Sequence, residues 1–376
     1  MKAVLVGATG VVGSAALEHF LERGADVVTV SRRRPHPPGA GRFEHLAIDL
    51  LDREATRSAL GALRGVTHVV YAALFEKPGL IAGWVDPDQI ENNGAMLRNV
   101  LDPLIASGAP LEHVSVLQGT KAYGFHVARM RVPAKERQPR VEHENFYWVQ
   151  QDYLEAMSRE HGWAHTIWRP QFIFGDAQGA AMNLIPVIGV YGALCRELGL
   201  PFSYPGGRSY IAEAVDSRLL AEALYWATDS PTARNQVFNI TNGDVFEWRD
   251  LWPSFAALLG VEVGDDAPRS LAEWLPSHAD TWARIAGREG LQQPDLLRLL
   301  GESHHYADNA FAWTPDGSVL ASREHPVLLS TVKLRQAGFT PSRDTEDMFA
   351  FWIRRLQEQH VLPTPLASAA GGSSAG

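Results

Sequence analysis

One lysine and one tyrosine could together stabilise an oxygen atom that gains negative charge during a reaction. Lys121 lies in the segment 117–124, directly after an expected strand, and Tyr147 lies near the start of an expected helix. A tyrosine hydroxyl can donate a hydrogen bond to such an oxygen, and a nearby ammonium group lowers the cost of the charge. The residue four positions after Tyr147 is Gln151, so the lysine is not on the same helix. We therefore expect the fold to bring Lys121 and Tyr147 together from different elements.

A glycine-rich turn near the beginning of the chain could hold a phosphate group. The run Gly7-Ala8-Thr9-Gly10-Val11-Val12-Gly13 follows an expected strand and opens an expected helix, whose free N–H groups can bind an anion. Gly7 permits a tight turn, Gly10 lets the backbone approach a pyrophosphate, and Gly13 allows close packing of helix on strand. In this setting the pattern predicts a dinucleotide-binding site, and a purely structural turn is the alternative. The expected contacts are Gly7, Thr9, Gly10, Val11, Val12 and Gly13.

The residues at the end of the second expected strand indicate which dinucleotide binds. An NAD site places Asp or Glu there, whereas this chain has Ser31-Arg32-Arg33-Arg34. Guanidinium groups pair with a 2′-phosphate, which a carboxylate would repel. The sequence therefore predicts NADP(H) as the cofactor, with Ser31, Arg32 and Arg33 as contacts. A solvated basic loop is the alternative.

Further contacts are expected at the carboxyl ends of the later strands, where open parallel sheets bind their ligands. Asp49 is placed to touch the adenine, and Ala72 and Ala73 are small enough to let the cofactor lie flat. The further cofactor contacts are Asp49, Leu50, Ala72, Ala73, Gln118, Lys121, Tyr147, Pro170 and Ile173. The apolar substrate pocket is expected to include Phe174, Met182 and Tyr204, with Trp274 and Trp313 as further candidates.

Strand and helix patterns alternate over the first half of the chain, which predicts a doubly wound α/β fold with a parallel sheet. Strands are expected at 3–6, 26–30, 46–48, 66–72, 113–117 and 164–168, and helices at 14–23, 53–63, 90–107 and 145–161. We assign residues 1–174 to a Rossmann domain, to which a strand near 237–241 returns. Residues 175–364 form a smaller, mostly helical substrate-capping domain. Residues 365–376 are expected to be a disordered tail.

The overall composition excludes several classes of function. The formal net charge is −9 and the pI is about 5.9, which argues against a nucleic-acid-binding protein. No apolar run is long enough to span a membrane, and we expect no signal peptide before the first strand. The one cysteine, Cys195, is expected to be inert packing and fits a cytoplasmic location. His304 and His305 lack a third ligand at a suitable spacing, so no metal is predicted.

Several motifs together resemble those of one known group of enzymes. They are Gly119-Thr120-Lys121-Ala122-Tyr123, Asn145-Phe146-Tyr147-Trp148, Arg169-Pro170, Ile173-Phe174-Gly175, Met182-Asn183-Leu184 and the run from Phe238 to Trp248. The chain thus resembles the progesterone 5β-reductase/iridoid synthase-like reductases, an atypical branch of the extended short-chain dehydrogenase/reductases. Ala122 stands where the plant members have His, and Trp148 stands where they have a second Tyr.

This resemblance implies an NADPH-dependent 1,4-reduction of the activated C=C bond of an enone or enal. The substrate would be steroid-like, terpenoid or a small cyclic enone, with hydride added to the β-carbon. Tyr147 would then stabilise the enolate oxygen, and Lys121 would hold the nicotinamide ribose and polarise Tyr147. Two alternatives stay open, a carbonyl reductase of aldehydes or ketones and a non-catalytic NADP(H)-binding regulatory protein. The sequence leaves both a monomer and a homodimer open.

Overall fold

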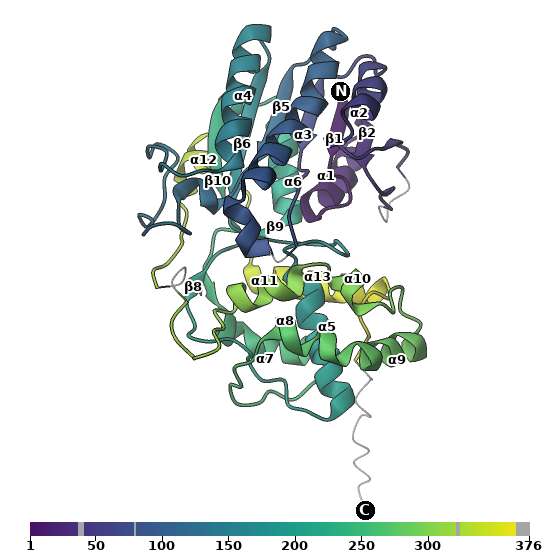
Figure 1. Ribbon diagram of the computed structural model, residues 1–376, viewed down its shortest axis with the longest axis vertical. Coiled ribbons are helices and arrows are strands. Elements are labelled where there is room, and N and C mark those ends of the chain that lie inside the picture. Colours follow the sequence, from purple (N-terminus) through teal and green to yellow (C-terminus); the bar gives the residue numbers. More distant parts are fainter. Residues whose placement is uncertain (37–40, 79, 321–323, 366–376) are drawn as a thin grey trace, which may run out of the picture.

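A computed structural model describes residues 1–36, 41–78, 80–320 and 324–365 of the chain. The molecule has two lobes, one built around a parallel sheet and the other mostly helical (Figure 1). The carboxyl ends of the strands point toward the helical lobe, so ligands bound at this edge would lie between the lobes. None of the described helices combines the length and the apolar character that crossing a membrane requires.

The larger lobe contains a seven-stranded sheet in the order β10-β6-β5-β4-β1-β2-β3. All six neighbouring pairs of strands are parallel. The strands are β1 (Lys2–Val6), β2 (Asp26–Ser31), β3 (Glu44–Ala47), β4 (His68–Tyr71), β5 (His113–Leu117), β6 (Ala164–Pro170) and β10 (Gln236–Ile240). This sheet confirms the predicted Rossmann fold, and the order of the strands reverses between β1 and β4, beside the glycine turn.

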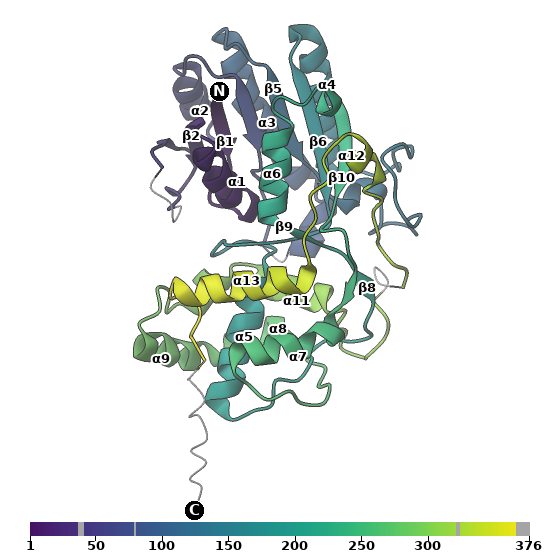
Figure 2. The same cartoon turned by 180° about the vertical axis from the view of Figure 1, so that it is seen from behind.

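Helices cover both faces of the sheet because each presents an apolar side to it. One face packs against α1 (Val11–Glu22) and α6 (Ser217–Trp226), which are seen in front of the sheet in Figure 2. The other face packs against α2 (Arg53–Gly61), α3 (Pro87–Ala106) and α4 (Phe146–His161). Asp52, Asp86 and Asn145 cap the N-termini of these three helices with their side chains, which satisfies backbone N–H groups that have no partner inside a helix.

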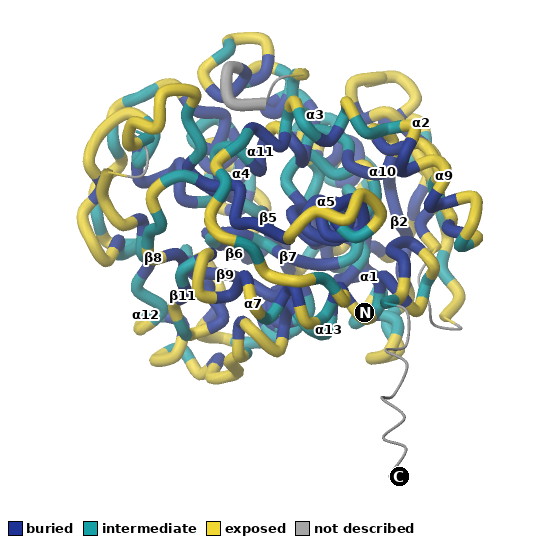
Figure 3. Tube along the Cα trace, turned by 90° about the horizontal axis from the view of Figure 1, so that it is seen from below, coloured by how far each residue is buried: buried dark blue, intermediate teal, exposed yellow. Residues whose placement is uncertain are grey.

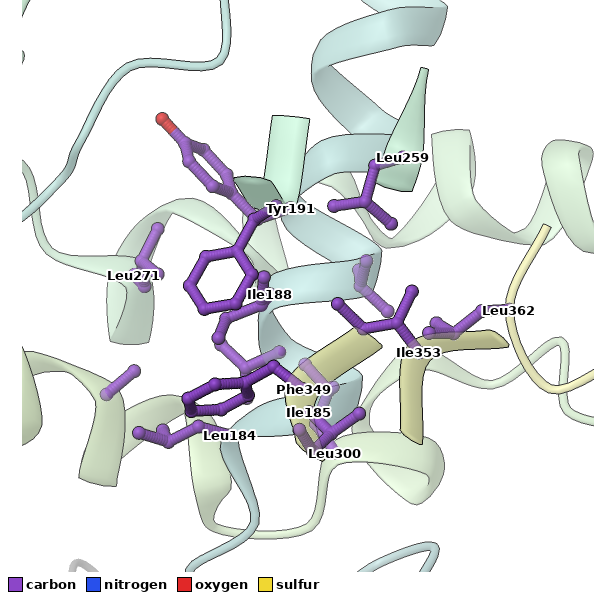
Figure 4. Close-up of a cluster of buried hydrophobic side chains, with 14 of the residues drawn as sticks. Leu184, Ile185, Ile188, Tyr191, Leu259, Leu271, Leu300, Phe349, Ile353 and Leu362 are labelled. Carbon is purple, nitrogen blue, oxygen red and sulfur yellow. The ribbon is translucent and has the colours of Figure 1, made fainter. Parts of the chain in front are cut away.

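The helical lobe is built around α5 (Leu184–Leu198), whose first twelve residues are all buried. Its Ile188 and Tyr191 lie among apolar side chains from several other segments, including Phe349 and Ile353 (Figure 4). Seen from below, the dark blue of α5 lies near the centre of this lobe (Figure 3). Cys195 is 1% exposed within this core, as expected for packing.

The remaining helices of this lobe surround α5. They are α7 (Trp248–Leu259), α8 (Leu271–Trp274), α9 (Ala279–Glu289), α10 (Leu296–Leu300), α11 (Ser303–Ala310) and α13 (Thr345–Glu358). Trp248 and Trp252 of α7 are both buried in the core of the lobe. Within the described residues, the short 3-10 helices are η1 (Leu80–Val85), η2 (Thr120–Tyr123), η3 (Pro231–Ala233) and η4 (Pro276–His278).

The chain passes between the two lobes several times. After β7 (Phe172–Phe174) and α5, it returns through β8 (Ile211–Ala212) and β9 (Ala214–Asp216) to α6 and β10. It then crosses to β11 (Phe246–Glu247) and α7, returns to α12 (Val332–Gln336), which lies against β10, and ends in α13.

We infer that the Rossmann lobe therefore includes α6 and α12 in addition to 1–174 and β10. A single cut at residue 174 would separate α6 from α1, although the two helices pack together. The predicted tail at 365–376 falls, from residue 366 onward, outside the described residues.

Candidate active site

The glycine turn forms a tight connection between β1 and α1. Gly7 has φ of +84°, and a β-carbon on it would lie 2.7 Å from the backbone N of Ala73. A β-carbon on Gly13 would lie 2.1 Å from the carbonyl oxygen of Gly7, so neither position accepts a side chain. Gly10 precedes α1 and provides no capping side chain, so the first N–H groups of this helix can face an anion. Ala72 and Ala73, at the end of β4, lie directly against this turn.

The other expected residues of the turn, Thr9, Val11 and Val12, lie at the same end of α1. The segment that follows β7 crosses this end, because a β-carbon on Gly175 would lie 3.0 Å from Cγ1 of Val11. The hydroxyl of Ser14 donates a 2.8 Å hydrogen bond to the carbonyl of Asp176, which joins the two segments. The segment after β7 therefore packs directly against the N-terminal end of α1, next to the glycine turn.

The three arginines follow β2 and are exposed. The Ser31 hydroxyl donates to the carbonyl of Arg33 at 2.7 Å and so fixes the turn that carries these residues. Nη2 of Arg33 lies 3.9 Å from where a β-carbon on Gly179 would be, so its guanidinium reaches the segment after β7. Arg34 instead lies over the ring of Phe43, 4.9 Å from its centroid. Arg32 and Arg33 are thus exposed residues that follow β2, whereas Arg34 packs against Phe43.

Asp49 and Leu50 lie between β3 and α2. The Asp49 carboxylate is exposed and accepts a 3.0 Å hydrogen bond from the backbone N–H of Leu51. Leu50 is buried, and its carbonyl accepts from the side chain of Asn99. Both residues lie at the carboxyl edge of the sheet, as does the pair of small residues after β4.

Lys121 and Tyr147 lie side by side although they come from different elements. Lys121 is on η2, after β5, and Tyr147 is in the first turn of α4. Nζ of Lys121 lies 5.7 Å from the centroid of the Tyr147 ring and 4.3 Å from that of Trp84. Each of the two side chains is only 8% exposed. Burial lowers the pKa of Lys121 from 10.5 to about 8, and the Glu76 carboxylate partly opposes this shift.

The Tyr147 hydroxyl lies over the backbone of Gly119. A β-carbon on Gly119 would be 3.1 Å from this hydroxyl oxygen and 3.7 Å from the carbonyl of Pro170. Burial raises the pKa of Tyr147 above its ordinary value, Glu76 adds to the rise, and Arg169 opposes it. At neutral pH the phenol is therefore a hydrogen-bond donor and not a base.

A buried network of polar side chains binds the backbone carbonyl of Tyr147. Nε of Arg169 donates to Oε1 of Gln118 at 2.9 Å, and Nε2 of Gln118 donates to Oε1 of Gln151 and to the carbonyl of Tyr147. The sequence predicted Gln118 as a cofactor contact, but its side chain is used in this network. Sequence reasoning missed the roles of Gln151 and Arg169, since neither pattern nor spacing links residues on β6 and α4.

Glu76 is a second residue that sequence reasoning missed. It lies in the loop after β4, and one of its carboxylate oxygens accepts from Gln89 at 2.7 Å. Burial raises the pKa of Glu76, while Lys121 and this hydrogen bond lower it. The segment Phe75-Glu76-Lys77 follows a strand that ends at the ligand-binding edge, and this position is the signal that could have identified it.

The residues expected around the substrate do not form one group. Phe174 and Tyr204 are each 1% exposed and pack in the core of the helical lobe, where Tyr204 also donates to the carbonyl of Phe311. A side chain that lines a pocket keeps accessible surface, so the expected substrate role of these two residues is not supported by their position. Met182 and Ile173 are half-buried. Met182 lies before α5, and Ile173 lies on β7, directly before the segment that crosses the end of α1.

Trp274 and Trp313 are half-buried residues of the helical lobe. Trp274 packs edge-on against Tyr191 and lies 4.1 Å from the ring of His278, so it belongs to the surface layer of this lobe. His304 and His305 lie on α11 with ring centroids 4.2 Å apart. Within the described ranges, no group of three or more His, Cys, Asp or Glu is arranged to hold a metal ion.

The motif from Phe238 to Trp248 helps to hold the site in place through Asn239. Oδ1 of Asn239, on β10, accepts a 2.6 Å hydrogen bond from the hydroxyl of Tyr123, which follows Lys121 on η2. The Asn239 amide donates to the carbonyls of Ala134 and Ser330. These contacts hold η2 in place and connect two of the motifs that are far apart in the sequence.

The chain is similar to several known proteins. The model of the PRISE-like Rossmann-fold domain family matches residues 48–298. The (S)-8-oxocitronellyl enol synthase of Antirrhinum majus is 30% identical over 96% of this chain and 92% of its own length. The 3-oxo-Δ(4,5)-steroid 5β-reductase of Arabidopsis thaliana is also 30% identical, over 96% of this chain and 93% of its own length.

Among solved structures, the UDP-glucose 4-epimerase of Thermus thermophilus in complex with NAD superimposes with a TM-score of 0.64. It is 18% identical, and the match covers 95% of this chain and 99% of the epimerase. This likeness concerns the fold of both lobes. The family match and the two relatives go further, and they show that the chain belongs to the PRISE-like Rossmann-fold domain family.

Proposed function

We propose that the protein is an NADPH-dependent ene reductase that reduces the activated C=C bond of an enone or enal. The observation that carries this proposal is the contact between Lys121 and Tyr147, 5.7 Å from ammonium nitrogen to ring centroid, beside the end of β5. Two groups from different elements thus provide a hydroxyl donor and a positive charge at the ligand-binding edge of the sheet. The protein's relatives named as an enol synthase and a steroid 5β-reductase support the same class of reaction.

The residues of the glycine turn suit a dinucleotide. Gly7 and Gly13 leave no room for side chains, and the uncapped N-terminus of α1 can receive a pyrophosphate. Arg32 and Arg33, exposed after β2, would hold the 2′-phosphate that distinguishes NADPH from NADH. Lys121 would hold the nicotinamide ribose by donating from its ammonium group. When bound, the nicotinamide would supply a hydride for the β-carbon of the substrate.

Tyr147 is the oxyanion donor in this proposal. As the β-carbon gains hydride, negative charge moves to the carbonyl oxygen, and the phenol hydroxyl donates a hydrogen bond to the enolate that forms. Because Gly119 has no side chain, the Tyr147 hydroxyl can lie close to its backbone. The Lys121 ammonium favours the charge electrostatically, and the buried site strengthens its effect.

The substrate is expected to be a small hydrophobic molecule with a conjugated carbonyl group. Aromatic side chains surround Lys121, with Trp84 at 4.3 Å and Phe146 at 5.6 Å from Nζ to the ring centroids. Such a lining favours an apolar ring or chain over a sugar nucleotide. We also propose that the protein is cytoplasmic, because its single cysteine is buried in a core and suits a reducing compartment. Its oligomeric state in this proposal is a monomer or a homodimer.

A product analysis tests the proposed reaction. The protein is incubated with NADPH and a panel of enones and enals, and the products are identified by mass spectrometry. We expect saturated carbonyl compounds or their enols. Allylic alcohols without saturated carbonyls would instead identify a carbonyl reductase. Tight NADPH binding without turnover of any member would indicate a regulatory protein.

A further inference from the structure

The guanidinium of Arg169 is a buried cation within the candidate site. Arg169 is the sixth residue of β6, and only 5% of its surface is exposed. In the part of the chain that the structure describes, its partners are two amide oxygens and two aromatic rings, and no carboxylate pairs with it. A buried charge without an ion pair lowers stability, and such departures from good packing are characteristic of functional sites.

The hydrogen bonds of Arg169 determine how two neighbouring amides are oriented. Its Nε donates to Oε1 of Gln118 at 2.9 Å, and its Nη2 donates to Oε1 of Gln151 at 3.4 Å. A guanidinium only donates, so both amides must turn their oxygens toward it. Nε2 of Gln118 then donates to the carbonyl of Tyr147 at 3.2 Å, and Nε2 of Gln151 donates to Oε1 of Glu155 at 2.7 Å. Without the guanidinium, nothing would keep the Gln118 amide from turning its oxygen toward this carbonyl.

The same guanidinium also contacts both elements that carry the catalytic pair. Its Cζ lies over the ring of Tyr123, 5.0 Å from the centroid, and over that of Trp148 at 5.7 Å. Tyr123 is on η2, two residues after Lys121, and Trp148 follows Tyr147 on α4. A planar cation is attracted to aromatic faces, so each ring is held against the same group.

We propose that Arg169 is a positioning residue that fixes the Tyr147 phenol relative to Lys121. It would act through Gln118 and through the two rings, and it would not touch the substrate. Nζ of Lys121 lies 5.7 Å from the Tyr147 ring centroid, and Arg169 would maintain this separation by holding η2 and the first turn of α4 together. The part of the proposal that concerns turnover rests on the proposed reductase function, whereas the clamping of α4 does not.

A double-mutant cycle with Tyr147→Phe separates positioning from general stability. Arg169→Met should lower kcat by about tenfold and leave the Kd for NADPH unchanged, because a displaced phenol affects the reacting oxygen and not the glycine turn. In the Tyr147→Phe background the same substitution should change kcat by less than about twofold, since the hydroxyl that Arg169 positions is already absent. Equal losses in both backgrounds would overturn the proposal.

Two further variants show which property of the arginine matters. Arg169→Lys keeps the charge but not the planar fork that reaches both amides, so its kcat should stay close to that of Arg169→Met. Native kcat in Arg169→Lys would contradict the clamp. Arg196→Met is the matched control, because Arg196 is also a largely buried arginine and donates to the carbonyl of Leu259 at 3.1 Å in the helical lobe. We expect native kcat in this control.

Hydrogen exchange of the backbone N–H groups in α4 tests the clamp without any turnover. In Arg169→Met, residues 147–151 should exchange about tenfold faster or more than in the native protein, and the end of the helix should keep its native rates. Native rates at 147–151 would overturn the proposal even if the protein is an ene reductase. Faster exchange there in a protein that reduces no enone would support the clamp and refute the proposed function.

Gln118→Leu covers the case in which Arg169→Met does not fold. This variant leaves the guanidinium in place but removes its link to the Tyr147 carbonyl. We expect a loss of kcat in the same direction, again only when the Tyr147 hydroxyl is present. Native kcat and native exchange rates at 147–151 in folded Gln118→Leu would contradict the proposed route from Arg169 to Tyr147.

Discussion

The hydroxyl oxygen of Tyr147 lies 3.1 Å from the position that a β-carbon on Gly119 would occupy. This distance is shorter than ordinary van der Waals contact, so a methyl group there must displace the phenol. Gly119 follows β5 and Tyr147 lies in the first turn of α4, so the contact joins the two elements that form the proposed catalytic centre.

Gly119→Ala should therefore reduce turnover without preventing cofactor binding. The displaced hydroxyl would meet the substrate oxygen less well, and we expect kcat to fall by about threefold to tenfold, since misplacement by a full ångström costs about 100-fold and this shift is smaller. Steady-state kinetics and NADPH titration would measure the two properties. Gly287→Ala, at an exposed helical position with open space around the glycine, controls for general effects of the substitution. A variant with native kcat would show that the hydroxyl position is not critical.

Tyr147→Phe should lower kcat by about 100- to 1,000-fold, the usual loss when one oxyanion donor is removed. The affinity for NADPH should change little, because the phenol is assigned to the substrate oxygen. Tyr153→Phe is a control on the same helix, where the hydroxyl donates to Asp102 at 2.5 Å. Equal kcat in native protein and Tyr147→Phe would refute the assignment of the oxyanion donor.

Replacement of the exposed arginines should change the choice of cofactor. In Arg32→Ala and Arg33→Ala, the Kd for NADPH should rise by about tenfold or more, because each loses charge-assisted hydrogen bonds to the 2′-phosphate. The Kd for NADH should stay the same. Arg34→Ala serves as the comparison, since Arg34 packs on Phe43. If the native protein binds NADH and NADPH equally well, the arginines have no such role.

Glu213 makes stability depend on pH. It is 6% exposed, accepts a 2.7 Å hydrogen bond from the backbone N–H of Leu329, and burial raises its pKa from 4.5 to about 7. A carboxyl with a raised folded-state pKa stabilises the fold below its unfolded pKa, and this contribution is lost as the pH rises through about 7.

Glu213→Gln should remove this dependence. The free energy of unfolding of the variant, minus that of the native protein, should increase by about 3 kcal/mol between pH 4.5 and pH 8. Urea denaturation at several pH values would measure the difference. A constant difference between the two proteins over this range would show that Glu213 does not titrate in the folded state.

The sequence predicted the Rossmann sheet well because most of its strands are short, largely apolar runs next to a turn or a helix. Val4 and Val28, for example, are fully buried on neighbouring strands. Lys121 and Tyr147 were identified by chemical type and by resemblance, and the structure brings them together. The return of α6 to the sheet was not predicted, because an amphipathic helix shows that one side is buried but not against which partner.

The sequence also could not separate pocket residues from core residues. Phe174 and Tyr204 are aromatic residues near the expected pocket, but both pack against Trp248 or Trp252. Glu76 was missed for the opposite reason. A glutamate in a loop normally indicates exposure, and only the contacts of Gln89 and Asn93 show that this one is held inside the protein.

The repeated crossing of the chain between its lobes limits how new specificities can be engineered. A chimera that takes residues 175–364 from another protein would replace strand β10 and helices α6 and α12 together with the helical lobe. The exchanged segment would then have to fit a foreign sheet edge and a foreign α1. Exchanging only α5 and the stretch from α7 to α11 would instead leave the sheet and α6 intact. Changes confined to these two stretches can therefore alter the helical lobe without disturbing the glycine turn.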